Sequence, residues 1–232
     1  MAFILDQNQV CRSSILSSVP WVSHGFGTAA GSPVTGAFHA SLHQTHSDRV
    51  LCIDRPGEKQ EDGDGLITQT PGLSISIRTA DCLPILLIDT QNRAVAAIHA
   101  GWRGTAAGIA QKTVAKMVEK FGSSPSALFA AIGPGIGECC FEVGDEVALH
   151  FAAFATAHKQ GKFHVDLKTA NLKQLVSCGL AEENVDVCSY CTVSSPGFHS
   201  FRRDRSEGRM TSAVQIILET AVGSCSRIYS SI

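Results

Sequence analysis

Hydrophobic residues occur along this chain in short runs and stripes that predict both strands and helices. Residues 73–77 (LSISI) alternate apolar and polar side chains with a period of two, which is typical of a half-buried strand. Residues 83–89 (LPILLID) form a nearly continuous apolar run of strand length, so we expect a strand that is covered on both faces. A turn at Gln91-Asn92 separates this run from residues 94–100 (AVAAIHA), and the two runs are expected to pair as a hairpin.

The rest of the chain adds helical periodicity to these strands. An amphipathic helix that ends at Gly122 and Pro125 is predicted by apolar residues at spacings of three and four, namely Ala110, Val114, Met117, Val118 and Phe121. We also expect helices near 144–154 and 167–178, and strands at 128–132, 185–193 and 210–218. Strands and helices alternate without a strict βαβ rhythm. The expected fold class is therefore α/β (α+β), a multilayer sandwich of mixed β-sheets flanked by helices.

Composition places this fold in an ordinary protein class. The chain has 232 residues, 44% hydrophobic and 17% charged, which is typical of a soluble globular enzyme with one domain over residues 1–232. A formal charge of −2 gives no reason to expect nucleic acid or an acidic membrane as a partner. We expect no signal peptide or transmembrane helix. Nine scattered cysteines, an odd number, predict reduced thiols in a cytoplasmic protein.

A candidate metal site follows from the predicted hairpin. Cys82 precedes its first strand and His99 lies near the end of its second, so both side chains are expected at the same end of the sheet. His46, in the segment HQTHSDRV, could supply a third ligand, although His43 competes with it. Two imidazoles and a thiolate suit Zn²⁺, and three protein ligands leave one position for water or substrate. From the residues alone, each of the three is more often an ordinary surface or core side chain than a metal ligand.

Other segments carry weaker signals. The Gly-rich GPGIG at 133–137 lacks the ending of a phosphate-binding P-loop, and Cys139-Cys140 after it is expected to serve packing. The C-x-x-C of residues 188–191 has no second pair and is poor evidence for zinc. The RRDR run at 202–205 is expected to be a solvated charged edge rather than a phosphate site.

Seven segments of the chain, in the same order, resemble the signature of one known family: HQTHSDRV, DGDGLIT, TADCLPILL, AAIHAGWRG, IGPGIGECCFEVGDEV, DLKTANLKQLVSCG and FHSFRRDRSEGRM. The chain is similar, over about residues 20–218, to the laccase-domain or polyphenol-oxidase-like proteins, also called multicopper-type purine nucleoside phosphorylases and peptidoglycan editing factors. This resemblance implies that His46, Cys82 and His99 are metal ligands. Two stretches depart from the family pattern: the segment before His46 is short, and residues after Leu218 match no part of it.

The resemblance also implies an activity. Family members are expected to cleave adenosine, inosine and S-methyl-5'-thioadenosine with phosphate and to deaminate adenosine, which makes purine nucleosides and phosphate the expected partners. Zn²⁺ is the implied cofactor, with Cu²⁺ as the alternative. Arg103, four residues after His99, is the first candidate to hold phosphate, and Arg78 and Arg49 are weaker candidates. Asp64 is the candidate acid or base, since Asp81 is expected to point away from Cys82.

Three alternative functions compete with this one. A true multicopper oxidase is disfavoured because the sequence has no H-x-H pair for a trinuclear copper cluster. A Cys-His amidohydrolase that edits peptidoglycan precursors would use Cys82 as nucleophile and His99 as base, and a bound metal would block that attack. A purely structural metal module is disfavoured because such zinc sites usually have four protein ligands. The oligomeric state is left open.

Overall fold

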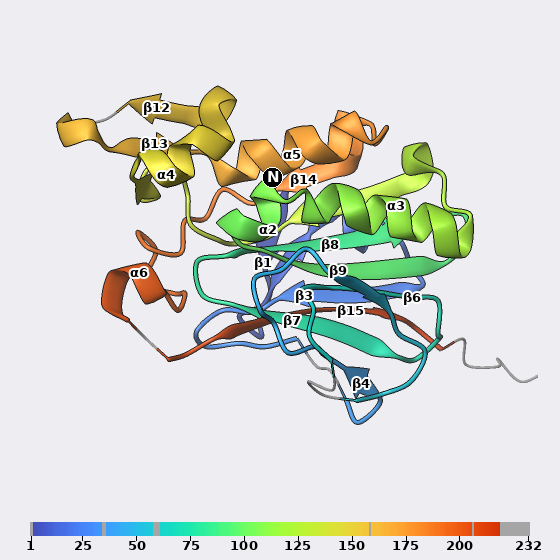
Figure 1. The fold of residues 1–232 in the computed structure, drawn as a ribbon. Coiled ribbons are helices and arrows are strands. Elements are labelled where there is room, and N and C mark those ends of the chain that lie inside the picture. Colours follow the sequence, from blue (N-terminus) through green and yellow to red (C-terminus); the bar gives the residue numbers. More distant parts are fainter. Residues whose placement is uncertain (1, 34–35, 58–60, 158, 206, 219–232) are drawn as a thin grey trace, which may run out of the picture.

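The computed structural model describes residues 2–33, 36–57, 61–157, 159–205 and 207–218. Two six-stranded mixed sheets lie face to face, and helices cover the outer face of one of them (Figure 1). The first sheet has the order β1-β2-β3-β15-β7-β4, with β1 Phe3–Leu5, β2 Cys11–Ser13, β3 Val22–Phe26, β15 Met210–Ile216, β7 Ser74–Thr79 and β4 His39–Ala40. The second has the order β14-β10-β8-β9-β6-β5, with β14 Val185–Val187, β10 Leu128–Ile132, β8 Leu83–Asp89, β9 Ala94–Ala100, β6 Gly65–Thr68 and β5 Val50–Cys52.

The predicted hairpin is the centre of the second sheet. Strands β8 and β9 pair antiparallel from Leu83↔Ala100 to Asp89↔Ala94, and every residue of both strands is buried. The carboxylate of Asp89 accepts hydrogen bonds from the backbone N–H groups of Gln91 and Asn92, which closes the turn. The strand β8 is therefore covered on both faces, as its continuous apolar run predicts.

Two apolar cores use opposite faces of this hairpin. Leu86, Ile88, Val95 and Ala97 pack against the first sheet, while the alternate residues of both strands face the helices. The helices are α1 Ser14–Ser17, α2 Trp102–Ala106, α3 Ile109–Phe121, α4 Asp145–Ala148, α5 Leu167–Ser177 and α6 Phe201–Asp204. In Figure 1, α2, α3 and α5 lie over the second sheet. The structure is thus the multilayer α/β sandwich that the sequence predicts.

A small third sheet projects beside these layers. It has the order β11-β13-β12 and is antiparallel throughout, with β11 Glu142–Val143, β13 Phe163–Val165 and β12 Ala155–Ala157. Helix α4 lies beside this small sheet (Figure 1). Four 3₁₀ segments complete the described elements, at Pro125–Ala127, Leu149–Phe154, Lys159–Gly161 and Glu182–Asn184. Among all the helices described, none is long and apolar enough to cross a bilayer.

Several sequence expectations need correction. Strand β7 is buried on both faces, because the alternate serines of LSISI also face protein: Ser76 bonds His39 from the neighbouring strand β4. Val118 is exposed although the helical stripe placed it in the core. The helix expected at 144–154 is α4 followed by a 3₁₀ segment with a kink at Phe151.

Two predicted strands are also shorter than expected. The strand expected at 185–193 ends at Val187, after which the chain turns toward the functional site, and the one expected at 210–218 ends at Ile216. The predicted helices at 110–121 and 167–178 are confirmed, and each ends before a glycine with positive φ, Gly122 and Gly179.

Candidate metal centre

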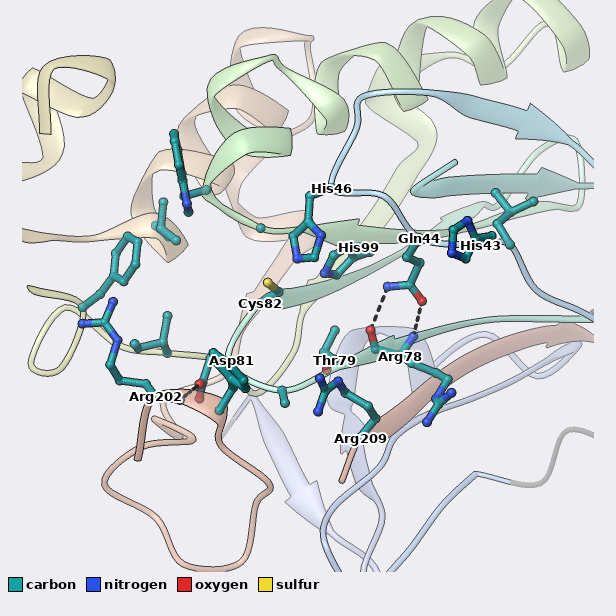
Figure 2. A pocket seen from close by; sticks show the side chains of 18 of the residues that line it. His43, Gln44, His46, Arg78, Thr79, Asp81, Cys82, His99, Arg202 and Arg209 are labelled. Carbon is teal, nitrogen blue, oxygen red and sulfur yellow. Dashed lines mark hydrogen bonds between the residues drawn. The ribbon is translucent and has the colours of Figure 1, made fainter. Parts of the chain in front are cut away.

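Three side chains from separate segments meet at one end of the β8–β9 hairpin. His99 pairs with Pro84 in the ladder, and Cys82 lies two residues before that proline, so the hairpin register brings the two together. His46 approaches from the loop between β4 and β5, and its ring centroid lies 4.8 Å from that of His99. One ligand atom from each side chain lies within 4.8 Å of the others. Figure 2 shows the two imidazoles and the sulfur turned toward one another.

Asp64 fixes two of these three residues. Its carboxylate is fully buried and accepts the Nδ1–H of His99 at 2.7 Å. It also accepts the backbone N–H groups of Thr45 and His46 at 3.2 and 3.1 Å, and both the N–H and the hydroxyl of Ser47 at 2.6 and 2.7 Å. Because Nδ1 of His99 is committed to Asp64, its Nε2 is left to face Cys82 and His46. The role of Asp64 as an acid or base stays a prediction, and in the structure its carboxylate holds His99 and the loop that carries His46.

In the metal-free protein the electrostatics of the site favour a charge pair, a thiolate at Cys82 beside a protonated His99, and a metal ion would take the place of the proton on Nε2 of His99. Burial raises the pKa of Asp64, but hydrogen bonds from His99 and Ser47 outweigh it and lower that pKa to about 2. Burial likewise raises the pKa of Cys82, yet the adjacent His46 and His99 lower it to about 6. Burial lowers the pKa of His99, whereas Asp64 and Cys82 raise it to about 9. A thiolate at Cys82 is the form that binds metal.

The loop that carries His46 is held in an unusual shape. His46 has a positive φ of 61°, which the Asp64 hydrogen bonds to its own and neighbouring N–H groups maintain. Two residues earlier, the amide of Gln44 exchanges two hydrogen bonds of 2.8 Å with the backbone of Arg78, at the edge of β7 (Figure 2). Gly101 completes the site, because a Cβ there would lie 3.0 Å from the sulfur of Cys82.

This donor set fits a metal ion. Two imidazole nitrogens and one thiolate form a borderline-soft group that suits zinc and also copper. The hydrogen bond from His99 to Asp64 is the outer contact that metal-bound histidines usually make. Because residue 101 is a glycine, no side chain presses on Cys82 and His46 from this position. The side chains therefore have both the chemistry and the clearance that a three-coordinate protein site requires.

A cavity of about 550 Å³ opens in front of these three residues. Its walls are partly apolar, with Leu42, Trp102, Ile136, Phe141, Leu167 and Phe201. Three arginines also line it, namely Arg78, Arg202 and Arg209. The volume lies within the roughly 300–1,000 Å³ that is typical of small-molecule sites. The cavity thus combines aromatic and cationic surface with a candidate metal.

The arginine that sequence reasoning favoured is not in this cavity. Arg103 is exposed and lies over the ring of its neighbour Trp102, at 4.4 Å from the ring centroid. Arg49 pairs with Glu61 on the surface instead. Arg202, from the run expected to be a solvated edge, lines the cavity, whereas the neighbouring Arg203 donates hydrogen bonds to loop carbonyls such as that of Phe198. All four residues of the RRDR run are exposed, as expected, but Arg202 also lines the cavity and Arg203 also holds a loop.

Asp81 joins the wall of the cavity to the strand that carries Cys82. Its side chain accepts the hydroxyl of Thr192 at 2.7 Å and the backbone N–H of Arg202 at 2.6 Å, and its carbonyl accepts the N–H of Ile136. Asp81 itself has a positive φ of 80°. The expectation that Asp81 points away from Cys82 assumed an extended strand, but with this φ Asp81 is not extended and both residues line the cavity.

Some cavity residues had no signal in the hydrophobic pattern. Gln44, Trp102 and Phe141 occur within the segments that carry the family resemblance, but neither their spacing nor their polarity marks them. Arg209 lies just before β15, and only the fold brings it to the cavity (Figure 2).

Comparison with known proteins agrees with this architecture. Residues 28–217 match the family described as multi-copper polyphenol oxidoreductase laccase. A Bacillus licheniformis structure named hypothetical protein YfiH superposes with a TM-score of 0.83 at 28% identity, covering 92% of this chain and 98% of that one.

Two curated relatives have names that state an activity. The purine nucleoside phosphorylase of Deinococcus radiodurans is 38% identical over 180 residues, which is 75% of this chain and 69% of that protein. The adenosine deaminase RL5, from an unknown prokaryotic organism, is 40% identical over 183 residues, or 69% of this chain and 68% of that protein. With the family match across residues 28–217, these similarities show that the chain belongs to the multi-copper polyphenol oxidoreductase laccase family.

Proposed function

We propose that this protein is a zinc-dependent purine nucleoside phosphorylase that also deaminates adenosine. The observation that carries the proposal is the convergence of His46, Cys82 and His99 at the cavity, beside three arginines. The names of the relatives supply the substrate class. We further propose adenosine, inosine and S-methyl-5'-thioadenosine as substrates, in the cytoplasm.

His46, Cys82 and His99 would hold the ion, and a bound Zn²⁺ supplies Lewis acidity and an acidified water. Asp64 keeps the proton of His99 on Nδ1, so that Nε2 stays available as a ligand atom. The backbone of His46 is held by the same carboxylate. The protein thus fixes the reaction centre before substrate arrives, which lowers the cost of orienting it.

The remaining cavity residues match the two halves of a phosphorolysis reaction. Aromatic and aliphatic side chains such as Phe141 and Leu167 offer an apolar surface for a purine base. Arg78, Arg202 and Arg209 offer guanidinium groups that can hold phosphate in hydrogen-bonded pairs near the sugar. Phosphate held in this way would attack the sugar carbon, and the purine would leave with the electron pair of the glycosidic bond.

A nucleoside panel assayed with and without phosphate tests this proposal. We expect free purine base and a sugar phosphate only when phosphate is present, and ammonia from adenosine in either condition. Base release that continues without phosphate would indicate hydrolysis and contradict phosphorolysis. Turnover of amide substrates by metal-free protein would instead support the Cys-His amidohydrolase, because the free thiolate of Cys82 would then be the nucleophile.

A further inference from the structure

A second group of sulfur atoms meets outside the centre described above. Cys139 and Cys140 follow the Gly-rich loop at 133–137, and Cys191 lies in the segment after β14. Their three sulfurs all lie within 4.8 Å of one another, and those of Cys139 and Cys140 are 3.5 Å apart. From the sequence, Cys139-Cys140 is expected to serve packing and the C-x-x-C at 188–191 is poor evidence for zinc, and fifty residues separate Cys140 from Cys191.

The backbone around these sulfurs is built for close approach. Gly135 pairs with Cys191 in an isolated parallel bridge, which sets the two segments side by side. The N–H of Gly137 points to the sulfur of Cys191 at 3.2 Å. A Cβ at Gly137 would lie 3.4 Å from the sulfur of Cys139 and 3.5 Å from that of Cys191, so the glycine packs against both. A backbone N–H directed at sulfur stabilises negative charge on it.

A buried cation lies next to this cluster. Lys168, on α5, is only 8% exposed, and its ammonium donates to the carbonyls of Cys188 and Tyr190 at 2.7 Å each. Burial lowers the pKa of Lys168, while the nearby Cys188, Cys191, Asp166 and Cys139 raise it. A divalent ion with three thiolates carries a net charge of −1, which a lysine ammonium would balance. Buried charges are usually paired in this way.

We propose that Cys139, Cys140 and Cys191 form a second metal site, which holds one thiophilic divalent ion such as Zn²⁺. Zinc–sulfur bonds of about 2.3 Å put the sulfurs of a tetrahedral site about 3.8 Å apart, which compares with 3.5 Å between Cys139 and Cys140 and at most 4.8 Å for the other two pairs. Cys139 is exposed, so solvent can reach the ion and supply the fourth ligand. Each thiol loses its proton to solvent as the sulfur–metal bond forms.

The position of this site gives it a structural role. Thr192, next to Cys191, donates to Asp81, which precedes Cys82. Phe141, next to Cys140, lines the cavity. An ion bound by the three sulfurs would therefore link the segment of Cys139 and Cys140 to that of Cys191. Both segments contact the cavity near the end of the hairpin that holds the proposed catalytic ion. The linking ion itself would not contact substrate.

Sulfur-specific metal spectroscopy on a Cys82→Ala background tests the proposal. The variant, reduced and purified anaerobically, is loaded with Co²⁺ or Zn²⁺. We expect one equivalent of either ion per chain and a strong thiolate-to-cobalt charge-transfer absorption. Because this variant lacks the sulfur of Cys82, such an absorption can come only from the second site. Adding Cys139→Ser or Cys191→Ser should reduce the stoichiometry from one to zero. Adding Cys52→Ser, at an exposed cysteine elsewhere, should change nothing.

The two serine variants make the result decisive even if one misfolds. Cys191 is buried, whereas Cys139 is exposed, so Cys139→Ser is expected to leave the fold intact. Absence of cobalt–sulfur absorption in reduced Cys82→Ala, or its persistence in the Cys139→Ser variant, would overturn the proposal. A failure of the catalytic proposal would look different, since wild type would then bind one ion and Cys82→Ala would still bind one.

Discussion

Asp64→Asn is the perturbation that most sharply separates positioning from acid–base catalysis. Oδ2 of Asp64 accepts three hydrogen bonds, whereas Oδ1 accepts two, from the N–H groups of His46 and His99. An asparagine would keep its single oxygen toward the three donors and turn its amide NH₂ toward the other two. Two charge-assisted hydrogen bonds are then lost at about 1.5 kcal/mol each, so the free energy of unfolding should fall by about 3 kcal/mol.

The same substitution should weaken metal binding. An NH₂ group facing Nδ1 of His99 makes that nitrogen the acceptor, and the ring proton moves to Nε2, where it blocks the ligand lone pair. Loss of such an outer contact typically costs 10- to 100-fold in metal affinity. Zinc affinity is measured by competition with a chromophoric chelator, and stability by urea unfolding of the metal-free protein.

A matched control separates these two effects. Asp89 is also fully buried and also accepts backbone N–H groups, but it closes the turn at the far end of the hairpin. Asp89→Asn should therefore lower stability and leave zinc affinity unchanged. If Asp64→Asn binds zinc as tightly as wild type and loses only the rate of catalysis, then the carboxylate acts as an acid or base and the positioning argument is refuted.

Three further predictions concern other residues. Arg202→Gln should raise the KM for phosphate roughly tenfold, as the loss of one charge-assisted hydrogen bond requires, whereas Arg103→Gln should leave it unchanged; the opposite ranking would restore the sequence expectation. Gly101→Ala should lower zinc affinity roughly tenfold, because its Cβ would lie 3.0 Å from the sulfur of Cys82; equilibrium dialysis measures this. Burial lowers the pKa of His24 to about 4, from 6.5. Between these values the unfolded chain binds a proton that the folded chain does not, so stability should fall by about 3 kcal/mol from pH 7 to 4. His24→Gln should remove that slope in urea titrations.

The hydrophobic pattern was most informative where burial is complete. The run at 83–89 and its partner at 94–100 are central strands with no exposed face, so their composition alone fixes their place. The turn at Asp89 then sets the register, and the register carries Cys82 to His99. This juxtaposition was therefore predictable from the residues, before any resemblance to a family.

The rest of the site depends on contacts that leave no local pattern. His46 reaches the hairpin because the buried Asp64 holds its loop, and that carboxylate lies 18 positions away in a Gly-rich turn. Proximity in sequence also misled: Arg103 follows His99 by four residues, but α2 begins between them and places Arg103 outside the cavity, over Trp102. The cavity arginines come instead from three separate places, Arg78 from β7, Arg202 from α6 and Arg209 from just before β15, which only the fold brings together.

The short strands of the first sheet could not be predicted from the sequence either. Strands β1, β2 and β4 have two or three residues each, too few for a period of two to be recognised. Serines in β7 are buried through contacts such as that of Ser76 with His39, which polarity alone would assign to solvent.

Metal depletion and reconstitution test the central claim most directly, with phosphate-dependent release of purine base from inosine as the readout. Removal of the metal should abolish the release, and Zn²⁺ should restore it in wild type but not in Cys82→Ala. Full activity in metal-free wild type, or restoration of Cys82→Ala by zinc, would contradict a catalytic ion held by His46, Cys82 and His99.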